Sequence, residues 1–94
     1  MAQVTMYTKT YCPYSKRARE LMNAKGVPFE DIDVTEDQSR FQEMVERSGG
    51  GTTVPQVFIA GRHVGGADDL DDLDDSGELD TLLGQEDGAS PSPA

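Results

Sequence analysis

The sequence predicts one α/β domain, a four-stranded mixed sheet flanked by helices in the order β-α-β-α-β-β-α. Three observations lead to this fold class. Short runs of strand-forming residues alternate with helical apolar stripes. A chain of 94 residues has room for a single modest core. The first two strands are joined through a helix, so we expect a parallel pair with a right-handed crossover.

The first strand and the first helix follow one another closely. Residues 4–7 alternate and are rich in strand formers, which predicts a strand. Residues 13–25 are good helix formers whose apolar side chains recur at spacings of three and four. Gly26 and Pro28 end that pattern. The polar segment between the two elements is therefore a strand-to-helix loop.

The second strand is predicted over residues 29–34 and the second helix over residues 35–48. The strand carries three acids, which suit an exposed edge or strand end. Thr35 with Gln38 is a plausible capping pair for the helix. The glycine run at 49–51 should end it, because no helix tolerates three glycines in succession.

A hairpin and a helical region complete the predicted fold. Residues 54–59 and 62–64 are expected to form strands joined by a tight turn at Ala60-Gly61. Leucines at helical spacing follow, and Ser76-Gly77 separates them into two short stripes. The second half of the chain therefore adds two strands and a helical region to the first βαβα unit.

Composition excludes several classes of protein. Apolar residues occur only in short runs, so we expect no membrane span and no signal peptide, and a soluble, cytoplasmic protein. The single cysteine cannot form an internal disulfide or a multi-cysteine zinc site, and no metal is expected. Residues 85–94 are polar and predict a disordered tail after a domain of residues 1–84.

The charge is strongly negative and unevenly distributed. The formal net charge is −10; all eight Lys and Arg lie at or before Arg62, and ten of the eighteen acids lie at or after Asp68. Nucleic acid is not expected as a partner, because phosphate binding needs clustered cations. The acidic half is interpreted as a solvated face, with adaptation to high salt as the open alternative.

Cys12 is the candidate nucleophile. Pro13 favours the first turn of a helix, which makes Cys12 the predicted N-cap. Free backbone N–H groups and the positive end of the helix dipole stabilise a thiolate there. Three cations add positive potential: Lys9, Lys16 and Arg17. The pKa of such a thiol can fall from about 8.5 towards about 3.5–7.5.

Cys12 has two alternative interpretations. The first is an inert packing cysteine in a strand-to-helix turn, which the neighbouring proline and cations disfavour. The second is a Cys–His hydrolase, which needs a histidine presented to the thiol. The only histidine, His63, lies in a predicted hairpin strand and is interpreted as a surface residue.

Three motifs occur in order across residues 4–83. Tyr11-Cys12-Pro13-Tyr14-Ser15 resembles the Cys-Pro-Tyr-Cys active site of the dithiol glutaredoxins, with Ser15 at the position of the second cysteine. Thr53-Val54-Pro55 resembles the Thr-Val-Pro segment of that family. Gly65-Gly66-Ala67-Asp68-Asp69 resembles its Gly-Gly-X-Asp-Asp segment. The resemblance to the glutaredoxin family implies a thioredoxin-like fold and a glutathione-dependent thiol–disulfide oxidoreductase.

The resemblance also implies a set of glutathione-binding residues. The family's proline is cis, so Pro55 is expected to be cis and the Val54 backbone to pair with the cysteine of glutathione. By the same resemblance, backbone N–H groups at the start of the last helical region would bind the γ-glutamyl carboxylate, with an aspartate as counter-ion to the ammonium. The predicted set is Lys9, Tyr14, Thr53, Val54, Pro55, Gly66, Ala67, Asp68 and Asp69.

Some of these assignments have structural alternatives. Asp68 and Asp69 could equally cap the helix that they begin. Arg40 is a second candidate, beside Lys9, for the glycyl carboxylate, and a solvated helix residue is an equal interpretation. Gln56, just after the proline, is a weaker candidate for the groove.

Ser15 limits the mechanism. A serine hydroxyl forms no disulfide, so the resemblance implies a monothiol reduction of glutathione mixed disulfides, with glutathione as co-substrate and glutathionylated proteins as partners of a monomer. Ser15 is either natural or an engineered replacement of a cysteine, which the dithiol-like surroundings favour; a second replacement at Ala67 is conceivable. Two alternative functions stay open: a glutathione-ligated [2Fe–2S] cluster carrier and a redox-silent glutathione-binding module.

Overall fold

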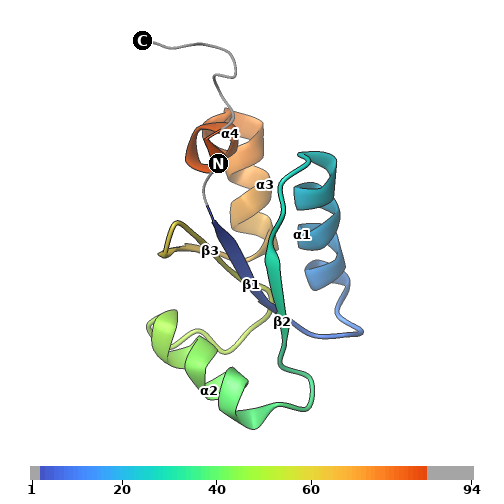
Figure 1. The fold of residues 1–94 in the computed structure, drawn as a ribbon, viewed down its shortest axis with the longest axis vertical. Coiled ribbons are helices and arrows are strands. Elements are labelled where there is room, and N and C mark those ends of the chain that lie inside the picture. Colours follow the sequence, from blue (N-terminus) through green and yellow to red (C-terminus); the bar gives the residue numbers. More distant parts are fainter. Residues whose placement is uncertain (1–2, 85–94) are drawn as a thin grey trace.

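The structure, a computed structural model, describes residues 3–84. It contains a four-stranded sheet and four helices (Figure 1). The elements in chain order are β1 (Val4–Thr8), α1 (Pro13–Ala24), β2 (Glu30–Asp33), α2 (Gln38–Arg47), β3 (Gln56–Ile59), β4 (Arg62–Gly65), α3 (Ala67–Ser76) and α4 (Glu78–Leu83). The predicted fold class is confirmed. Gly77, at φ 84°, ends α3 and separates it from α4, where a division was expected.

The sheet has the strand order β2-β1-β3-β4. β1 pairs in parallel with β2 and antiparallel with β3, and β3 and β4 form the expected hairpin. Tyr7 near the end of β1 is opposite Gln56 at the start of β3. The loop after β1 and the loop before β3 therefore lie at the same end of these two antiparallel strands. Those two loops carry Cys12 and Val54.

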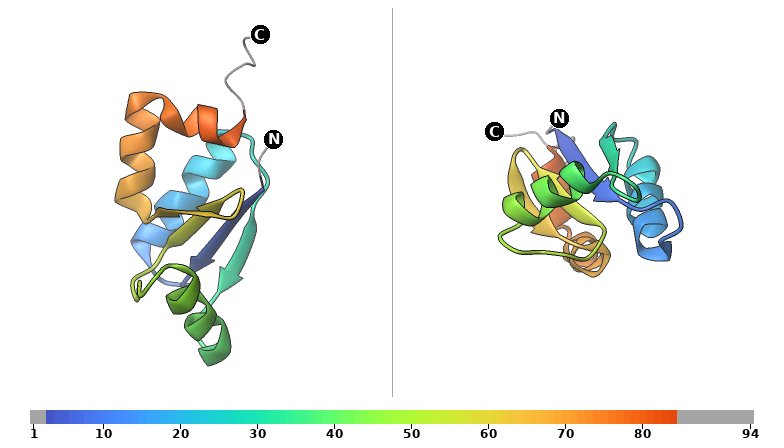
Figure 2. Two further views of the ribbon diagram at one scale, coloured as in Figure 1. Left: turned by 90° about the vertical axis from the view of Figure 1, so that its left-hand side faces the viewer. Right: turned by 90° about the horizontal axis from the view of Figure 1, so that it is seen from below.

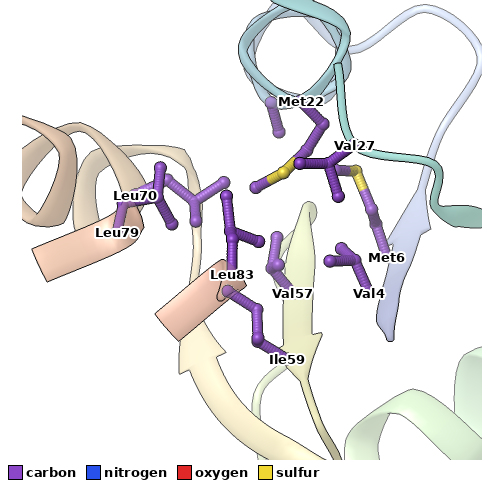
Figure 3. Close-up of a cluster of buried hydrophobic side chains, with 10 residues drawn as sticks. Val4, Met6, Met22, Val27, Val57, Ile59, Leu70, Leu79 and Leu83 are labelled. Atoms are coloured by element: carbon purple, nitrogen blue, oxygen red, sulfur yellow. The ribbon is translucent and has the colours of Figure 1, made fainter. Parts of the chain in front are cut away.

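One core lies between the sheet and three of the helices. Side chains of β1 and β3 that point to this face pack against α1, α3 and α4 (Figure 3). The buried members of this cluster are Val4, Met6, Ala18, Met22, Val27, Val57, Ile59, Leu70, Leu79 and Leu83. Each apolar stripe predicted for α1, α3 and α4 therefore faces the sheet, and this core fixes where α1 and α3 begin.

A second, smaller cluster covers the opposite face of the sheet, where α2 packs (Figure 2). Its buried members are Tyr7, Val34, Met44 and Phe58. Of these, Tyr7 on β1 and Phe58 on β3 alternate with residues of the first core, as the two-residue period of a strand requires. The Tyr7 hydroxyl donates a hydrogen bond to Glu43 and accepts one from Arg47 Nη1 at 2.7 Å. α2 is thus joined to the sheet by both apolar and polar contacts.

Two element starts differ from the prediction. α2 is capped by Asp37, whose Oδ1 accepts from the Arg40 N–H at 3.0 Å, so the Thr35–Gln38 cap was wrong. Thr35 instead accepts from the Thr10 N–H at 2.9 Å, while its own N–H donates to Asp33. β3 begins at Gln56 rather than at residue 54, because Val54 belongs to the preceding loop.

The remaining boundaries agree with the prediction to within one or two residues. The tail predicted for residues 85–94 lies outside the described residues. None of the helices between residues 3 and 84 is both long and apolar enough to cross a membrane.

Candidate active site

Cys12 lies at the N-cap of α1, in the loop that leaves β1. Its backbone is extended, with φ −91° and ψ 119°, and Pro13 occupies the first turn. The Cys12 carbonyl accepts the first helical hydrogen bond, from the Lys16 N–H at 3.0 Å. The predicted N-cap position is therefore confirmed, and the half-buried thiol lies where helix N–H groups are free.

The pKa of Cys12 lies below its ordinary value. Burial is the largest single influence and raises the pKa, because it disfavours the thiolate. Hydrogen bonds from the Ser15 N–H, the Ser15 hydroxyl and the Tyr14 N–H outweigh burial together, and the charge of Lys9 adds to them. The helix start thus favours the thiolate form of Cys12.

Ser15 takes part in this arrangement in a way that the sequence did not suggest. Its side chain is fully buried, and its Oγ accepts from the Lys9 N–H at 3.2 Å. Its hydroxyl also hydrogen-bonds to the Cys12 sulfur and lowers the pKa of the thiol. Ser15 therefore links the end of the β1 loop to the nucleophile.

The loop before β3 lies beside the thiol. The Val54–Pro55 peptide bond is cis, which confirms the expected geometry. The Cys12 Sγ lies 3.8 Å from the Val54 carbonyl oxygen. Gly66 allows α3 to begin close to the same loop, because a Cβ there would lie 3.3 Å from the Pro55 carbonyl oxygen.

One groove brings together most of the predicted residues. Its volume is about 480 Å³, and it lies between Tyr14 on α1, the loop before β3 and the start of α3. Eight of the nine predicted glutathione-binding residues line it: Tyr14, Thr53, Val54, Pro55, Gly66, Ala67, Asp68 and Asp69. Their role in binding glutathione stays a prediction, but the structure places them around one space.

The predicted cations lie elsewhere. Lys9 lines a neighbouring hollow of about 320 Å³ beside the start of α2, with its Nζ 5.9 Å from the centre of the Phe41 ring. Arg40 pairs with Glu43 at 3.1 Å on its own helix, in line with its interpretation as a solvated residue. Arg17 pairs with Asp71 and approaches Asp68 at 3.8 Å, which ties α1 to α3.

The two aspartates at the start of α3 are not equivalent. Asp69 Oδ2 accepts from the Gly66 N–H at 2.9 Å, so this carboxylate caps the helix. The Asp68 side chain is 85% exposed. Asp68 is therefore the carboxylate more available to a bound ammonium group.

His63 and Gln56 also line the groove, although neither belongs to the predicted glutathione-binding set. His63 is exposed on β4, as predicted, but it also lines the groove. Its Nε2 lies 2.6 Å from Oε1 of Gln56, which had been the weaker candidate. Strand alternation was the available signal, because Gln56 lies two residues from Phe58, and Phe58 is opposite His63 in the hairpin.

A protein-family model described as Glutaredoxin matches residues 4–64. The chain belongs to the glutaredoxin family. Members of this family are glutathione-dependent oxidoreductases. Glutaredoxin 3 of Escherichia coli K12 is 49% identical over 83 residues, which are 88% of this chain and 99% of that protein. A glutaredoxin of Pseudomonas aeruginosa is 43% identical over 83 residues, with 88% and 98% covered.

Solved glutaredoxins share the fold. The solution structure of a glutaredoxin from Brucella melitensis has a TM-score of 0.78 and 46% sequence identity, and the match covers 92% of each chain. A buckwheat glutaredoxin, solved as a complex with glutathione, has a TM-score of 0.80 and 29% identity. That match covers 96% of this chain and 83% of the buckwheat chain.

Proposed function

We propose that this glutaredoxin reduces glutathione mixed disulfides by a monothiol mechanism with Cys12 as the nucleophile. The observation that carries the proposal is the position of the Cys12 sulfur. It has a lowered pKa and lies 3.8 Å from the carbonyl of Val54, a residue that lines the groove. A nucleophile therefore stands at the edge of a space lined by backbone groups and by an exposed carboxylate.

Groups in and beside the groove can serve each polar part of glutathione. The N–H and C=O of Val54 can pair with the backbone of its cysteine. The free N–H groups of Ala67 and Asp68 at the start of α3 suit the γ-glutamyl carboxylate, and the exposed Asp68 carboxylate suits the ammonium group. Lys9, which lines the hollow beside the start of α2 and whose charge lowers the pKa of Cys12, is the candidate for the glycyl carboxylate. The buckwheat complex supports glutathione as the occupant.

The first half of the reaction transfers the glutathionyl group to the protein. The Cys12 thiolate attacks the glutathione sulfur of the substrate disulfide, a Cys12–glutathione disulfide forms, and the substrate sulfur leaves as a thiolate that takes up a proton. In the second half, the thiolate of another glutathione attacks the bound glutathionyl sulfur. Glutathione disulfide forms and Cys12 leaves as a thiolate, favoured by its lowered pKa.

Because Ser15 occupies the position of the second cysteine, this protein has no second thiol of its own to take part in the cycle. Its hydroxyl cannot form a disulfide, so no internal disulfide can release a protein substrate from Cys12. The proposal therefore assigns glutathionylated proteins and small glutathione mixed disulfides as substrates of a monomer, rather than intramolecular protein disulfides. It holds equally if Ser15 is a natural residue or a replacement of a cysteine, because the chemistry depends on the side chain present.

The test is turnover of a small glutathione mixed disulfide, coupled to glutathione and glutathione reductase. We expect the Cys12→Ser variant to fall to the uncatalysed rate, and the Ser15→Cys variant to gain reduction of an intramolecular protein disulfide. Ser76→Ala, at the far end of α3, is the control. A Cys12→Ser protein as active as the parent would contradict the proposal.

The two alternative functions give different results in the same preparation. A cluster carrier reconstituted with iron, sulfide and glutathione would show visible absorption and glutathione-linked dimers in size-exclusion chromatography. A redox-silent module would bind glutathione in calorimetry without any turnover. The proposed enzyme instead turns over and elutes as a monomer.

A further inference from the structure

A series of polar contacts joins an exposed histidine on β4 to the loop that carries Val54. His63 Nε2 lies 2.6 Å from Gln56 Oε1. The Gln56 Nε2 donates to the Thr53 carbonyl oxygen at 3.0 Å and contacts the Thr53 hydroxyl at 3.3 Å. Gln56 is only 6% exposed, so His63 and Thr53 satisfy the two ends of a buried amide.

The direction of these hydrogen bonds follows from donor and acceptor chemistry. The Thr53 carbonyl can only accept, so the NH₂ group of Gln56 must face it. The Gln56 oxygen then faces His63, and His63 Nε2 must carry a proton. Both the neutral Nε2–H tautomer and the imidazolium ion meet this requirement. The contact therefore does not depend on the charge of His63.

The histidine ring lies against a buried aromatic side chain. Its centroid is 5.1 Å from that of Phe58 on the neighbouring strand. Phe58 also lies edge-on to Tyr7 at 5.8 Å, and the Arg47 guanidinium is 4.4 Å from the centre of its ring. Tyr7 and Phe58 are both buried. The ring of His63 thus packs against Phe58 of the smaller cluster that α2 covers, while its Nε2 lies next to the Gln56 oxygen.

The loop that carries Val54 is held by different contacts at its two ends. At its start, the Gly50 N–H donates to the Val45 carbonyl oxygen at 2.8 Å, and the Gly51 N–H donates to Ser48 Oγ at 2.8 Å. Thr53 is exposed, so apolar packing does little to hold it. The hydrogen bonds from Gln56 fix the residue directly before Val54, whose carbonyl lies 3.8 Å from the Cys12 sulfur.

We infer that His63 and Gln56 are positioning residues for the groove, which hold Thr53 so that the Val54 backbone is ready to pair with a glutathionyl group. The inference rests on the proposed function, because it assigns that pairing to the Val54 backbone. Loss of either side chain should weaken the binding of the mixed disulfide, while the thiol of Cys12 keeps its reactivity.

Four variants separate this role from a general structural one. His63→Phe keeps a ring against Phe58 but removes the donor, and Gln56→Met keeps the length of the side chain but removes its hydrogen bonds. His63→Gln restores a donor to Gln56. Arg62→Phe places the same aromatic side chain at the neighbouring exposed position of β4.

Steady-state kinetics gives the first readout. His63→Phe and Gln56→Met should raise KM for the glutathione mixed disulfide about fivefold, as expected for about one lost hydrogen bond, with kcat within about twofold of the parent. His63→Gln and Arg62→Phe should stay within about twofold of the parent KM. The rate of Cys12 alkylation by iodoacetamide should be the same in all proteins. An unchanged KM in His63→Phe, or an equal slowing of alkylation, would overturn the inference.

Backbone ¹⁵N relaxation gives a second readout that needs no turnover. The order parameters of the Thr53 and Val54 amides should fall in His63→Phe and Gln56→Met but not in His63→Gln. If the parent fails to turn over the mixed disulfide while these order parameters fall, the proposed function is wrong and the positioning role stands. If turnover is normal and the order parameters do not change, the positioning role is wrong and the proposed function stands.

Discussion

The Ser15 hydroxyl has two partners, and both bear on the nucleophile. It accepts from the Lys9 N–H at 3.2 Å and hydrogen-bonds to the Cys12 sulfur. The first contact holds the backbone of Lys9, whose charge also lowers the pKa of Cys12. Ser15, which cannot form a disulfide itself, thereby contributes to lowering the pKa of Cys12.

Replacing Ser15 by alanine should raise the pKa of Cys12, because the thiolate loses a hydrogen-bond donor. The Lys9 N–H also loses its acceptor, so we expect the free energy of unfolding to fall by about 1 kcal/mol. Thiolate absorbance at 240 nm against pH measures the first effect, and urea unfolding the second. Ser76→Ala, far from Cys12 on α3, is the control for the pKa measurement. A pKa of Cys12 unchanged by Ser15→Ala would show that the hydroxyl has no part in thiolate stabilisation.

The position of a single residue was predictable where its neighbours in the sequence determine that position. The N-cap position of Cys12 could be predicted from Pro13 alone, because a proline in the first turn places the preceding residue at the N-cap. Ser15 and His63 could not be assigned in the same way. The contacts that matter for them, to the Lys9 backbone and to Gln56, exist only once the loop has folded back and the hairpin register is set.

At the scale of elements, Asp33 joins the end of β2 to the loop that leaves β1. Its carboxylate accepts from the Thr10 hydroxyl at 2.6 Å and from the Thr35 N–H at 2.7 Å. Hydrogen bonds from Thr10 and Thr35 lower the pKa of Asp33 to about 2. The start of the active-site loop is therefore held by a carboxylate that must be ionised.

This contact should make stability depend on pH in a defined window. The pKa of Asp33 is depressed from 3.8 to about 2 in the folded protein, so its contribution is fully present above the unfolded value and is lost as pH falls through the folded one. The difference in unfolding free energy between parent and Asp33→Asn should be constant from pH 5 to 7 and shrink below about pH 4. Urea unfolding measures it, with Asp72→Asn as the control. A difference that stays constant down to pH 2.5 would contradict the assignment.

The local sequence pattern predicted which segments are helices and which are strands. It did not always predict the residue at which an element begins. α1 begins at Pro13 as predicted and ends at Ala24, two residues before Gly26, which has a positive φ. The cap of α2 was misplaced by two residues, because Asp33 binds the Thr35 N–H and the Thr35 hydroxyl turns to Thr10. The contact with Thr10, 25 residues away in the chain, is not visible in a local window, whereas the contact with Asp33 is local.

Over the whole molecule, the net charge of −10 opposes compactness. α3 and α4 concentrate acids, and two cations of α1 and its C-cap neutralise part of them. Arg17 pairs with Asp71, and Lys25 Nζ lies 2.7 Å from Asp74 and 2.8 Å from Asp80. The other acids of α3, among them Asp72 and Asp75, face solvent.

Salt should therefore stabilise the fold, because screening reduces repulsion among many acids more than it weakens the few ion pairs. Between 10 mM and 0.5 M sodium chloride we expect a gain of about 1 kcal/mol, or about 4–8 °C in the thermal midpoint. Calorimetry measures the midpoint. The double variant Asp72→Asn/Asp75→Asn should show a smaller rise than the parent, and a midpoint that falls with salt would mean that the ion pairs dominate.

The three sequence motifs, taken together, predicted most of the residues that line the groove. Thr53-Val54-Pro55 and Gly66-Ala67-Asp68 do meet in one space beside Tyr14. Lys9 did not join them, because the loop carries its side chain towards Phe41 and the start of α2. Motif order indicates which segments converge, whereas the direction of one long side chain depends on packing across the sheet.

The antiparallel pairing of β1 with β3 has a consequence for biosynthesis. Val54 follows Cys12 by 42 residues, so the nascent chain carries the thiol before the loop and the helix that enclose it have been made. Until β3 docks, Cys12 lacks the Val54 loop that lies beside its sulfur in the folded protein, and its thiol is open to oxidants. Translation and docking of the second half of the chain therefore set how long the nucleophile stays unprotected.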